Sequence, residues 1–324
     1  MARLGTDSAW KRVCFALLLC AAAGIPLQAQ TFTSLVNFNG TNGGDPDGSL
    51  VQGLDGNLYG TTNGGGSQDD AGEIYKIMPS GTLTALYSFA CPQNMCASGS
   101  DPSAGLVLAT NGSFYGTAVG GGAKNQGTVF KITSHGSFTT LHSFAFKQGR
   151  NPYAGLIQAT DGYLYGTTER NGSHGGGTVF KITTAGKLTT LYNFCSQTNC
   201  ADGRNPFAGL VQGADGNFYG TTLNGGTSAS NCGAFGCGTL FRITPSGTLT
   251  TLYDFCSKTN CTDGGNPYSG VMQALDGNFY GTTWQGGACP PGCGSGTVFR
   301  ITSNGVLSTI HQLQRHSGHV HGRL

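Results

Sequence analysis

The chain has 324 residues, of which 56 are glycine and only 10% are charged. Residues 30–324 carry equal numbers of acidic and basic side chains and no basic stripe, which argues against a nucleic-acid partner. Regular short apolar runs between the glycines indicate many short strands and turns, and they argue against a disordered linker or long amphipathic helices.

The first 29 residues have the pattern of a secretory signal peptide. Arg3, Lys11 and Arg12 precede the apolar run Val13–Ile25, which is too short to span a bilayer. A possible cleavage site follows, with Ala29 as the last residue removed. We therefore expect an exported protein, secreted or at the cell surface, with the periplasm as an alternative. No later apolar run is long enough to cross a membrane.

The rest of the sequence is organised around an eight-residue motif, Asp-Gly-Asn-Phe-Tyr-Gly-Thr-Thr at Asp215–Thr222. Four similar copies occur at Asp55–Thr62, Asn111–Ala118, Asp161–Thr168 and Asp276–Thr283. The tyrosines of successive copies are 50 to 61 residues apart. Self-similarity at such a period is typical of a repeat architecture, so the fold has to be inferred from the repeat.

The third repeat illustrates the expected elements. Four strands are predicted at Gly155–Ala159, Tyr163–Thr168, Thr178–Thr183 and Leu188–Phe194, with the first turn at Asp161-Gly162. The predicted third and fourth strands alternate in a way that leaves apolar side chains on both faces. In the third strand, Phe180 and Ile182 oppose Val179. In the fourth, Leu188 and Tyr192 are expected to oppose Leu191.

A small sheet that is apolar on both faces has to be packed between neighbouring sheets. Radial stacking achieves this and leaves only short edges. We therefore predict an all-β fold, a β-propeller of about five four-stranded antiparallel blades, with a linear β-solenoid as the second possibility. The predicted repeats in the single domain 30–313 are approximately 46–89, 102–144, 152–194, 206–255 and 267–313.

A sixth copy of the fourth-strand pattern stands alone near the N-terminus, at Phe32–Phe38. We expect an extra strand at 31–38. Two alternatives remain: five blades with a spare strand, or an incomplete six-bladed ring that this strand would close. Residues 314–324 do not resemble the repeat, and we expect a disordered tail there.

Ten cysteines after the predicted signal peptide form five close pairs. They are Cys91/Cys96, Cys195/Cys200, Cys232/Cys237, Cys256/Cys261 and Cys289/Cys293. In an exported chain an even set of cysteines indicates disulfides. Zinc is the competing interpretation, because paired cysteines are its usual ligands, but few histidines lie nearby. We expect local disulfides that stiffen loops.

The unit GLVQ-x-x-DGNFYGTT, followed by a glycine-rich loop and GTVFKIT-x-x-GTLTTLY-x-F, resembles the GloVer tandem repeat of exported bacterial "choice-of-anchor" proteins. The resemblance covers nearly all of residues 31–313. It implies a secreted or surface protein, and it supplies no catalytic residues to transfer. The motif is also similar to blades of periplasmic sensor propellers, which agrees with the predicted fold.

In a four-stranded meander the 2–3 and 4–1 connections share one side, which we call the loop face. All the long variable loops and all five cysteine pairs fall there, so we expect a ligand to bind there. The residue after Gly-Thr-Thr, or its variant, differs in every repeat: Asn63, Val119, Glu169, Leu223 and Trp284. Such variation suits a recognition surface, and it also suits tolerance in an exposed loop. Our ligand-binding candidates are Asn63, Glu169 with Arg170 beside it, and Trp284. Trp284 could stack on a sugar or cover a disulfide loop.

The loop before each first strand carries an Asp-Pro or Asn-Pro dipeptide. The five are Asp45-Pro46, Asp101-Pro102, Asn151-Pro152, Asn205-Pro206 and Asn266-Pro267. Asp and Asn at such positions commonly build turns. A ring of these oxygens is a conceivable cation site, but calcium prefers several charged ligands and three of the five are Asn. We therefore expect no metal.

Catalytic groups are scarce. The chain has only two Glu, Glu73 and Glu169, which are weak candidates for a hydrolytic pair because they lie two repeats apart. No nucleophile elbow, phosphate loop or dinucleotide fingerprint is present, so no cofactor is expected. The first hypothesis is a non-enzymatic exported protein that binds a glycan or a surface protein. The alternatives are a carbohydrate-active hydrolase or lyase on the same scaffold, and a passive structural repeat of the cell surface.

Overall fold

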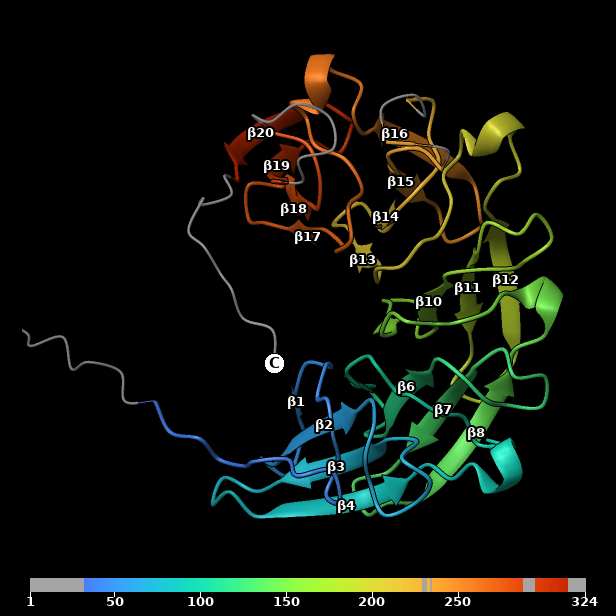
Figure 1. Cartoon of the computed structure of the whole chain (residues 1–324), viewed down its shortest axis with the longest axis vertical. Helices are drawn as coiled ribbons and strands as arrows, with labels where there is room; N and C mark the ends of the chain where they lie inside the picture. Colours follow the sequence, from blue (N-terminus) through green and yellow to red (C-terminus); the bar gives the residue numbers. More distant parts are fainter. Residues whose placement is uncertain (1–31, 229–231, 234, 288–294, 314–324) are drawn as a thin grey trace, which may run out of the picture. The chain divides into compact units, whose positions relative to one another are not determined.

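The computed structural model describes residues 32–228, 232–233, 235–287 and 295–313 (Figure 1). The chain divides into two units, Met1–Leu35 and Val36–Leu324, and the second contains every assigned strand. The expected signal peptide at 1–29 and the expected tail at 314–324 lie outside the described residues. In the described part of the chain, no helix is long and apolar enough to cross a membrane.

The described residues form five four-stranded antiparallel sheets, each in the order of the sequence, as the repeat predicts. We call them blades 1 to 5. Blade 1 contains β1 (Val51–Gln52), β2 (Leu58–Thr62), β3 (Glu73–Ile77) and β4 (Leu83–Ser88). Blade 2 contains β5 (Val107–Leu108), β6 (Phe114–Ala118), β7 (Thr128–Ile132) and β8 (Phe138–Ser143). Blade 3 contains β9 (Ile157–Gln158), β10 (Leu164–Thr168), β11 (Thr178–Ile182) and β12 (Leu188–Asn193).

Blade 4 contains β13 (Val211–Gln212), β14 (Phe218–Thr222), β15 (Thr239–Ile243) and β16 (Leu249–Asp254). Blade 5 contains β17 (Met272–Gln273), β18 (Phe279–Thr283), β19 (Thr297–Ile301) and β20 (Leu307–Gln312). Four single-turn 3₁₀ helices lie in the connections between blades: η1 (Pro92–Asn94), η2 (Phe146–Gln148), η3 (Thr198–Cys200) and η4 (Thr259–Cys261). The all-β propeller predicted from the sequence is confirmed.

An Asp-Gly or Asn-Gly dipeptide, followed by a tyrosine three residues after the glycine, closes the first turn of each blade. In blade 4, Asp215 accepts hydrogen bonds from the backbone N–H of Asn217 at 3.1 Å and from the hydroxyl of Tyr219 at 2.9 Å. Gly216 has a φ of +79°, a conformation that glycine adopts without strain. Burial and the bond to Asp215 raise the pKa of Tyr219 to about 12. The motif therefore ties the turn to the strand that follows it.

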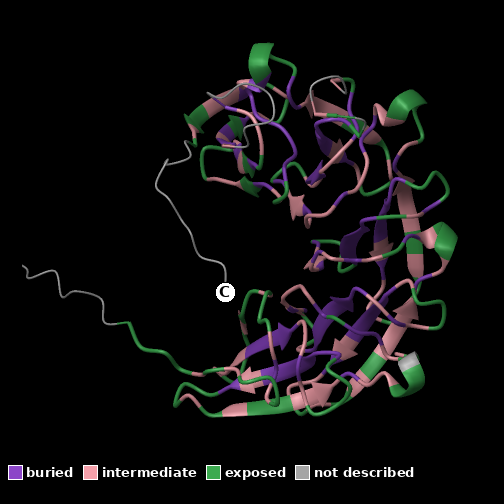
Figure 2. Ribbon diagram, in the orientation of Figure 1, coloured by how far each residue is buried: buried purple, intermediate pink, exposed green. Residues whose placement is uncertain are grey.

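The hydrophobic core lies between neighbouring blades. At the boundary of blades 4 and 5, the Tyr219 ring stacks on Phe279 with centroids 3.9 Å apart, and Phe255 contacts Phe299 at 5.2 Å. The Thr221 hydroxyl also donates to the carbonyl of Ser269 at 3.0 Å. Four such clusters join the five blades in chain order. Figure 2 shows the buried residues concentrated in the second and third strands. Both faces of blades 2 to 4 are apolar and covered by neighbouring blades, as predicted.

The fourth strand differs from the predicted alternation. A β-bulge leaves Leu191 between the paired residues Thr190 and Tyr192. The extra residue shifts the side-chain phase, because strand residues otherwise alternate between faces. Leu191 and Tyr192 therefore both pack toward blade 4, whereas Leu188 packs toward blade 2. The expectation that Tyr192 shares a face with Leu188 was wrong.

The bulge also explains a glycine in the second turn of the next blade. Gly247 has a φ of +98°, and a Cβ atom built on it would lie 2.7 Å from the Leu191 carbonyl oxygen. Any larger residue would push this turn away from the bulged strand. Glycine at this position thus lets blade 4 approach blade 3 closely.

Residues 32–39 belong to no assigned strand, in contrast to the strand expected over 31–38, of which residue 31 is not described. Within the second unit, the Phe38 ring packs against Tyr75 of blade 1, with centroids 5.1 Å apart. The sequence similarity to a fourth strand is therefore matched by an aromatic contact, without strand pairing.

Candidate functional site

The Asn-Pro dipeptides join the loop face of one blade to the next. Asn205 has a φ of +57°, and its carbonyl accepts a hydrogen bond from the backbone N–H of Leu223 at 2.9 Å. Its side-chain amide donates to the carbonyl of Glu169 in the preceding blade at 3.2 Å. Asn266 bonds to the Leu223 carbonyl in the same way at 2.8 Å. These amides are engaged in holding turns, in agreement with the turn interpretation.

The residue after each Asn-Pro is aromatic, and these side chains meet. Tyr153 stacks on Phe207 with centroids 4.7 Å apart, and Phe207 contacts Tyr268 at 4.6 Å. Tyr268 in turn lies 6.0 Å from Trp284. We call Tyr153, Phe207, Tyr268 and Trp284 the aromatic row. Its first two members are half-buried, whereas Tyr268 and Trp284 are 49% and 64% exposed.

A cavity of about 540 Å³ lies beside the aromatic row. Its lining includes Glu169, Arg170, Arg204, Asn224 and Tyr268. A smaller cavity of about 200 Å³ shares Asn224 and Tyr268 with it and is also lined by Trp284. The two cavities therefore lie side by side along the exposed end of the row, and polar and aromatic side chains line both of them.

The charges around the larger cavity are unequal. Glu169 is buried and pairs with the Nε of Arg170 at 3.1 Å. Arg204 has no ion-pair partner among the described residues, and its buried Nε makes no hydrogen bond there. Its guanidinium lies 5.2 Å from the centroid of Phe235, in cation–π range. Burial, followed by the charge of Glu169, raises the pKa of Tyr153. The lining thus carries one paired and one unpaired arginine.

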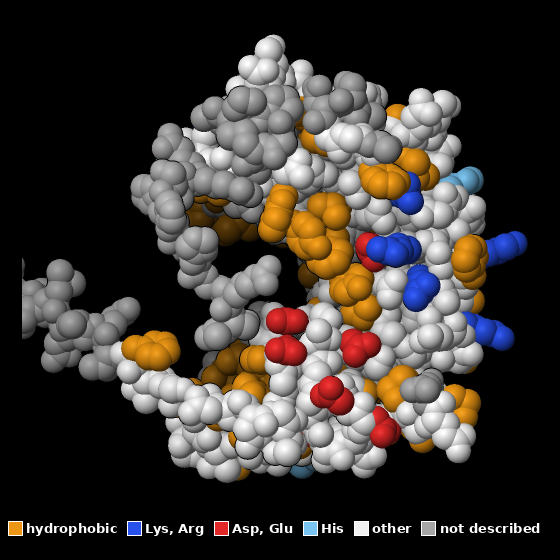
Figure 3. Space-filling view, viewed as in Figure 1, with side chains coloured by type: hydrophobic (Ala, Val, Ile, Leu, Met, Phe, Trp, Pro, Cys, Tyr) orange, Lys and Arg blue, Asp and Glu red, His pale blue; other side chains and the backbone are white. Residues whose placement is uncertain are grey.

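Charge is distributed unevenly on the face seen in Figure 3. Basic side chains gather beside hydrophobic ones over the region of β10 to β14, and acidic side chains gather over the region of β1 to β8. Exposed acidic residues of the loops there are Asp45, Asp47, Asp69, Asp70 and Asp101. Blades 3 and 4 contribute Arg150, Arg170 and Arg204. A ligand that approaches the aromatic row therefore meets positive charge on one side.

The structure brings several of the candidate residues together. Glu169 and Arg170 line the larger cavity together with Leu223, the variable loop residue of the fourth repeat, and Trp284 lines the adjoining cavity. Asn63 is half-buried in blade 1, where its side-chain oxygen accepts a hydrogen bond from Ser103 at 3.2 Å. Asn63 lines neither cavity. Binding by these residues stays a prediction.

The proposed glutamate pair is not brought together at the cavity. Glu73 is buried in blade 1, where it accepts hydrogen bonds from the Ser88 hydroxyl at 2.6 Å and from the Ser67 backbone N–H at 3.2 Å. Threonine occupies the matching position in the other blades, for example Thr239. Glu73 therefore has a packing role in its own blade and does not line the cavity that contains Glu169.

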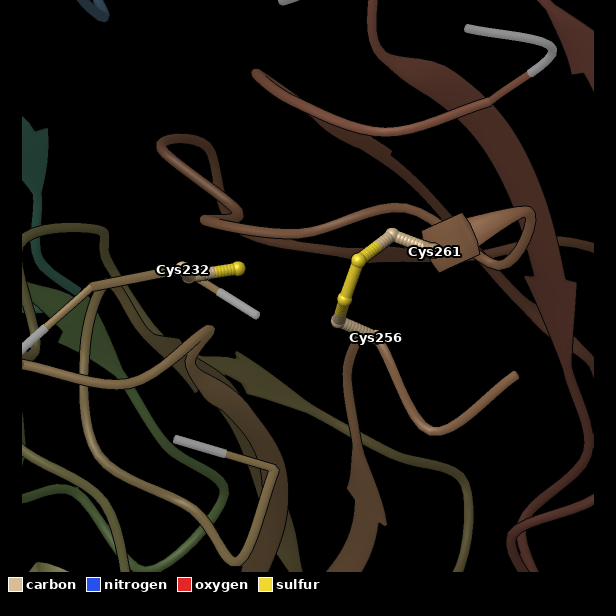
Figure 4. Close-up of side chains that lie close together, drawn as sticks. All are labelled: Cys232, Cys256 and Cys261. Atoms are coloured by element: carbon tan, nitrogen blue, oxygen red, sulfur yellow. A yellow bond between two sulfur atoms is a disulfide. The ribbon is translucent and has the colours of Figure 1, made fainter. Parts of the chain in front are cut away.

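Four of the five predicted cysteine pairs form disulfides: Cys91–Cys96, Cys195–Cys200, Cys232–Cys237 and Cys256–Cys261. The fifth pair, Cys289 and Cys293, lies outside the described residues. Figure 4 shows Cys232 directed toward the Cys256–Cys261 bond, and these three sulfur atoms lie within 4.8 Å of one another. Because each sulfur is already bonded to another, the group offers no thiolate to zinc.

Sequence reasoning missed most of the aromatic row. Tyr153, Phe207 and Tyr268 directly follow the Asn-Pro turns, and the turn chemistry of those dipeptides does not indicate a role for the residue after them. The signal was present: the residue after Pro is aromatic in repeats three to five, but is Asp47 and Ser103 in the first two. An aromatic side chain at a fixed loop position in consecutive blades predicts a cluster.

Comparison with known proteins gives a family and a fold. A sequence model of the Gloeobacter/Verrucomicrobia repeat matches residues 93–259. No curated protein sequence matches the chain significantly.

Three solved structures that align with this chain are as follows. A fungal alcohol oxidase of the AA5 family, in complex with copper, aligns with a TM-score of 0.52 at 14% identity, over 83% of this chain and 53% of that chain. Endo-1,4-β-xylanase from Bacteroides thetaiotaomicron aligns with a TM-score of 0.40 at 12% identity, over 85% of this chain and 99% of that chain. A Mycobacterium tuberculosis puromycin-hydrolyzing peptidase aligns with a TM-score of 0.46 at 11% identity, over 84% of this chain and 38% of that chain. At such identities the likeness concerns the fold alone.

Proposed function

Since the chain belongs to the Gloeobacter/Verrucomicrobia repeat family and its blades present a row of aromatic rings, we propose that it is an exported, non-enzymatic protein that binds a glycan through its loop face. The aromatic row is the observation that carries this proposal. Four rings from three successive blades lie 4.6 to 6.0 Å apart, and the two at one end are well exposed. Disulfides in the neighbouring loops support an exported location.

A sugar ring suits this surface because one of its faces is largely C–H and its edges carry hydroxyl groups. The C–H face can pack on Tyr268 or Trp284, since an exposed aromatic side chain offers a rigid apolar surface. Asn224 and Gln285 beside them can hydrogen-bond with hydroxyl groups. An apolar platform with a few adjacent polar groups is the usual composition of a ligand site.

The carboxyl groups available at the site favour binding without hydrolysis of the glycan. Hydrolysis of a glycosidic bond commonly uses two carboxyl groups that flank the bond. Among the described residues, Glu169 is the one carboxylate that lines the two cavities, and it is already paired with Arg170. Glu73 is occupied by Ser67 and Ser88.

The test is a glycan array probed with the purified chain that begins at residue 30, followed by calorimetric titration of the oligosaccharides that bind. Trp284→Ala and Tyr268→Ala should each weaken binding by about tenfold or more, equal to about 1.4 kcal/mol. Tyr163→Ala is the matched control, because Tyr163 is an exposed aromatic residue at the turn between β9 and β10, on the opposite side of the blade.

Three outcomes would contradict the proposal. The absence of binding to any glycan on a broad array would favour a passive structural repeat. An equal loss in the Tyr163→Ala variant would remove the aromatic row as the cause. Release of shortened oligosaccharides from a bound glycan, abolished by Glu169→Gln, would show an enzyme.

A further inference from the structure

The face of each blade that turns toward the following blade, its outgoing face, is buried in blades 1 to 4. In the second strands of blades 2 to 4 all five residues are buried. In β18 of blade 5, only Phe279 and Thr283 are buried. The remaining positions, including Tyr280 and Thr282, are half-buried or exposed, although Tyr219 and Thr221 at the same positions in blade 4 are at most 1% exposed.

The outgoing face of blade 5 keeps the apolar character of its counterparts. Met272, Ile310 and Leu313 are 64%, 54% and 40% exposed. Leu313 occupies the position of Phe255, which is fully buried against blade 5. This face therefore has the composition of an interface that is formed four times elsewhere in the described residues.

The opposite, incoming face of blade 1 is partly covered by residues that imitate a preceding blade. Phe38 contacts Tyr75 with centroids 5.1 Å apart, and in blade 5 the corresponding contact is Phe255 with Phe299 at 5.2 Å. The chain after Phe38 also follows the path of a connection between blades. Gly66 donates a backbone hydrogen bond to Gly40 at 2.8 Å, as Gly287 does to Cys261 at 2.9 Å.

Phe38 thus occupies the place that the last aromatic residue of a preceding fourth strand would take. Residues 32–38 also carry the sequence pattern of that strand. In a propeller, the free outgoing face of the last blade and the incoming face of the first blade flank the same position. Both faces therefore fit one further blade.

We propose that the outgoing face of blade 5 binds a further sheet of the same repeat, which supplies strands one to three and takes residues 32–38 as its fourth strand. The docking chemistry follows from the existing interfaces. The sheet has to present an aromatic or leucine side chain to Tyr280, as Phe279 does to Tyr219. A glutamine at the end of its first strand would accept a hydrogen bond from the Leu275 backbone, as Gln273 does from Ala214 at 2.8 Å.

The chain itself offers a suitable occupant. Residues 145–183 comprise the connection after blade 2 and the strands β9, β10 and β11, and they contain no cysteine. A variant is made in which a second copy of residues 145–183 follows Leu313. Docking would raise Tm by about 5 °C, protect the added strands from protease and slow hydrogen exchange in β18. The Phe38→Ala change should then lower Tm more in the extended chain than in the original chain.

The matched control carries serine in the added copy at the positions of Leu164 and Phe180, which would face Tyr280 and the Leu313 side of blade 5. It keeps the length and the turns but loses the apolar contacts, and its Tm should equal that of the original chain. The proposal is overturned if the extended chain shows no gain in Tm and its added strands are cleaved. It is also overturned if the original chain dimerises and Tyr280→Asp makes it monomeric, because the occupant is then a second copy.

Discussion

Replacing Tyr219 by alanine should destabilise the protein far more than replacing Tyr280, although the two tyrosines occupy the same position of the repeat. Tyr219 is fully buried between blades 4 and 5 and stacks on Phe279 at 3.9 Å. Tyr280 makes the same kind of hydrogen bond, to Asp276 at 2.7 Å, but no following blade covers its ring among the described residues. The comparison therefore isolates the contribution of burial between blades.

The magnitude follows from the contacts of Tyr219. Removal of a large buried aromatic side chain costs about 3–5 kcal/mol. Loss of the hydroxyl bond to Asp215 adds about 1 kcal/mol. Asp215 is exposed, so water can replace that donor and no unpaired buried group is left. A Tyr219→Phe variant keeps the ring and removes only the hydroxyl, so it should lose about 1 kcal/mol.

Urea unfolding of the three variants and the parent chain, followed by circular dichroism and fluorescence, measures these differences through the midpoint and slope. The expected order of stability is parent, then Tyr219→Phe, then Tyr219→Ala, with Tyr280→Ala close to the parent. Equal losses for Tyr219→Ala and Tyr280→Ala would refute the view that the core lies between blades. A loss in Tyr219→Phe as large as in Tyr219→Ala would assign the effect to the turn.

Two further predictions concern pH and ligand charge. Burial and the hydrogen bonds to Asp55 and Asp215 raise the pKa of Tyr59 and Tyr219 to about 12, whereas tyrosine in an unfolded chain titrates near about 10. The folded state therefore holds these protons more tightly, so the stabilisation is complete below about pH 10 and is lost as the pH rises toward about 12. Tyrosinate absorbance and circular dichroism should change together in a pH titration. Tyrosine ionisation near about pH 10 with the fold intact would contradict this prediction. In titration calorimetry, Arg204→Gln should lower the affinity for a uronate-containing oligosaccharide about tenfold and leave the affinity for its neutral analogue unchanged. Equal losses of affinity for the two sugars would assign Arg204 a structural role.

The blades could be predicted from the sequence because each is built from nearby residues. The Asp161-Gly162 turn, the β-branched third strand and the short connection before Leu188 are local signals, and five copies make them consistent. Cysteines five residues apart also leave little choice of partner. Local disulfides were therefore expected correctly at the four described pairs.

The bulge in the fourth strand could not be predicted, because it places one extra residue within a run of apolar and polar residues that reads as regular. The Leu191 carbonyl is approached by Gly247 of the next blade, and an alternating pattern in sequence does not reveal an inserted residue. The consequence was an incorrect face for Tyr192.

The candidate site required the arrangement of the blades. Tyr153, Phe207 and Tyr268 are 54 and 61 residues apart in sequence, and they meet only because successive blades pack side by side. Trp284 and Glu169 could be selected from the sequence because they vary within a constant frame. No sequence pattern indicates that Arg204 lies over the Phe235 ring or that its Nε makes no hydrogen bond among the described residues.

The placement of each hydrophobic cluster between consecutive blades has an evolutionary consequence. A unit that contacts only its neighbours can be duplicated or deleted in frame, and the new junction reuses an existing pair of complementary walls. Every unit acquired in this way also brings one loop position after its Asn-Pro. Gene duplication in such a chain can therefore lengthen the aromatic surface in steps of one ring, without redesign of the scaffold beneath it.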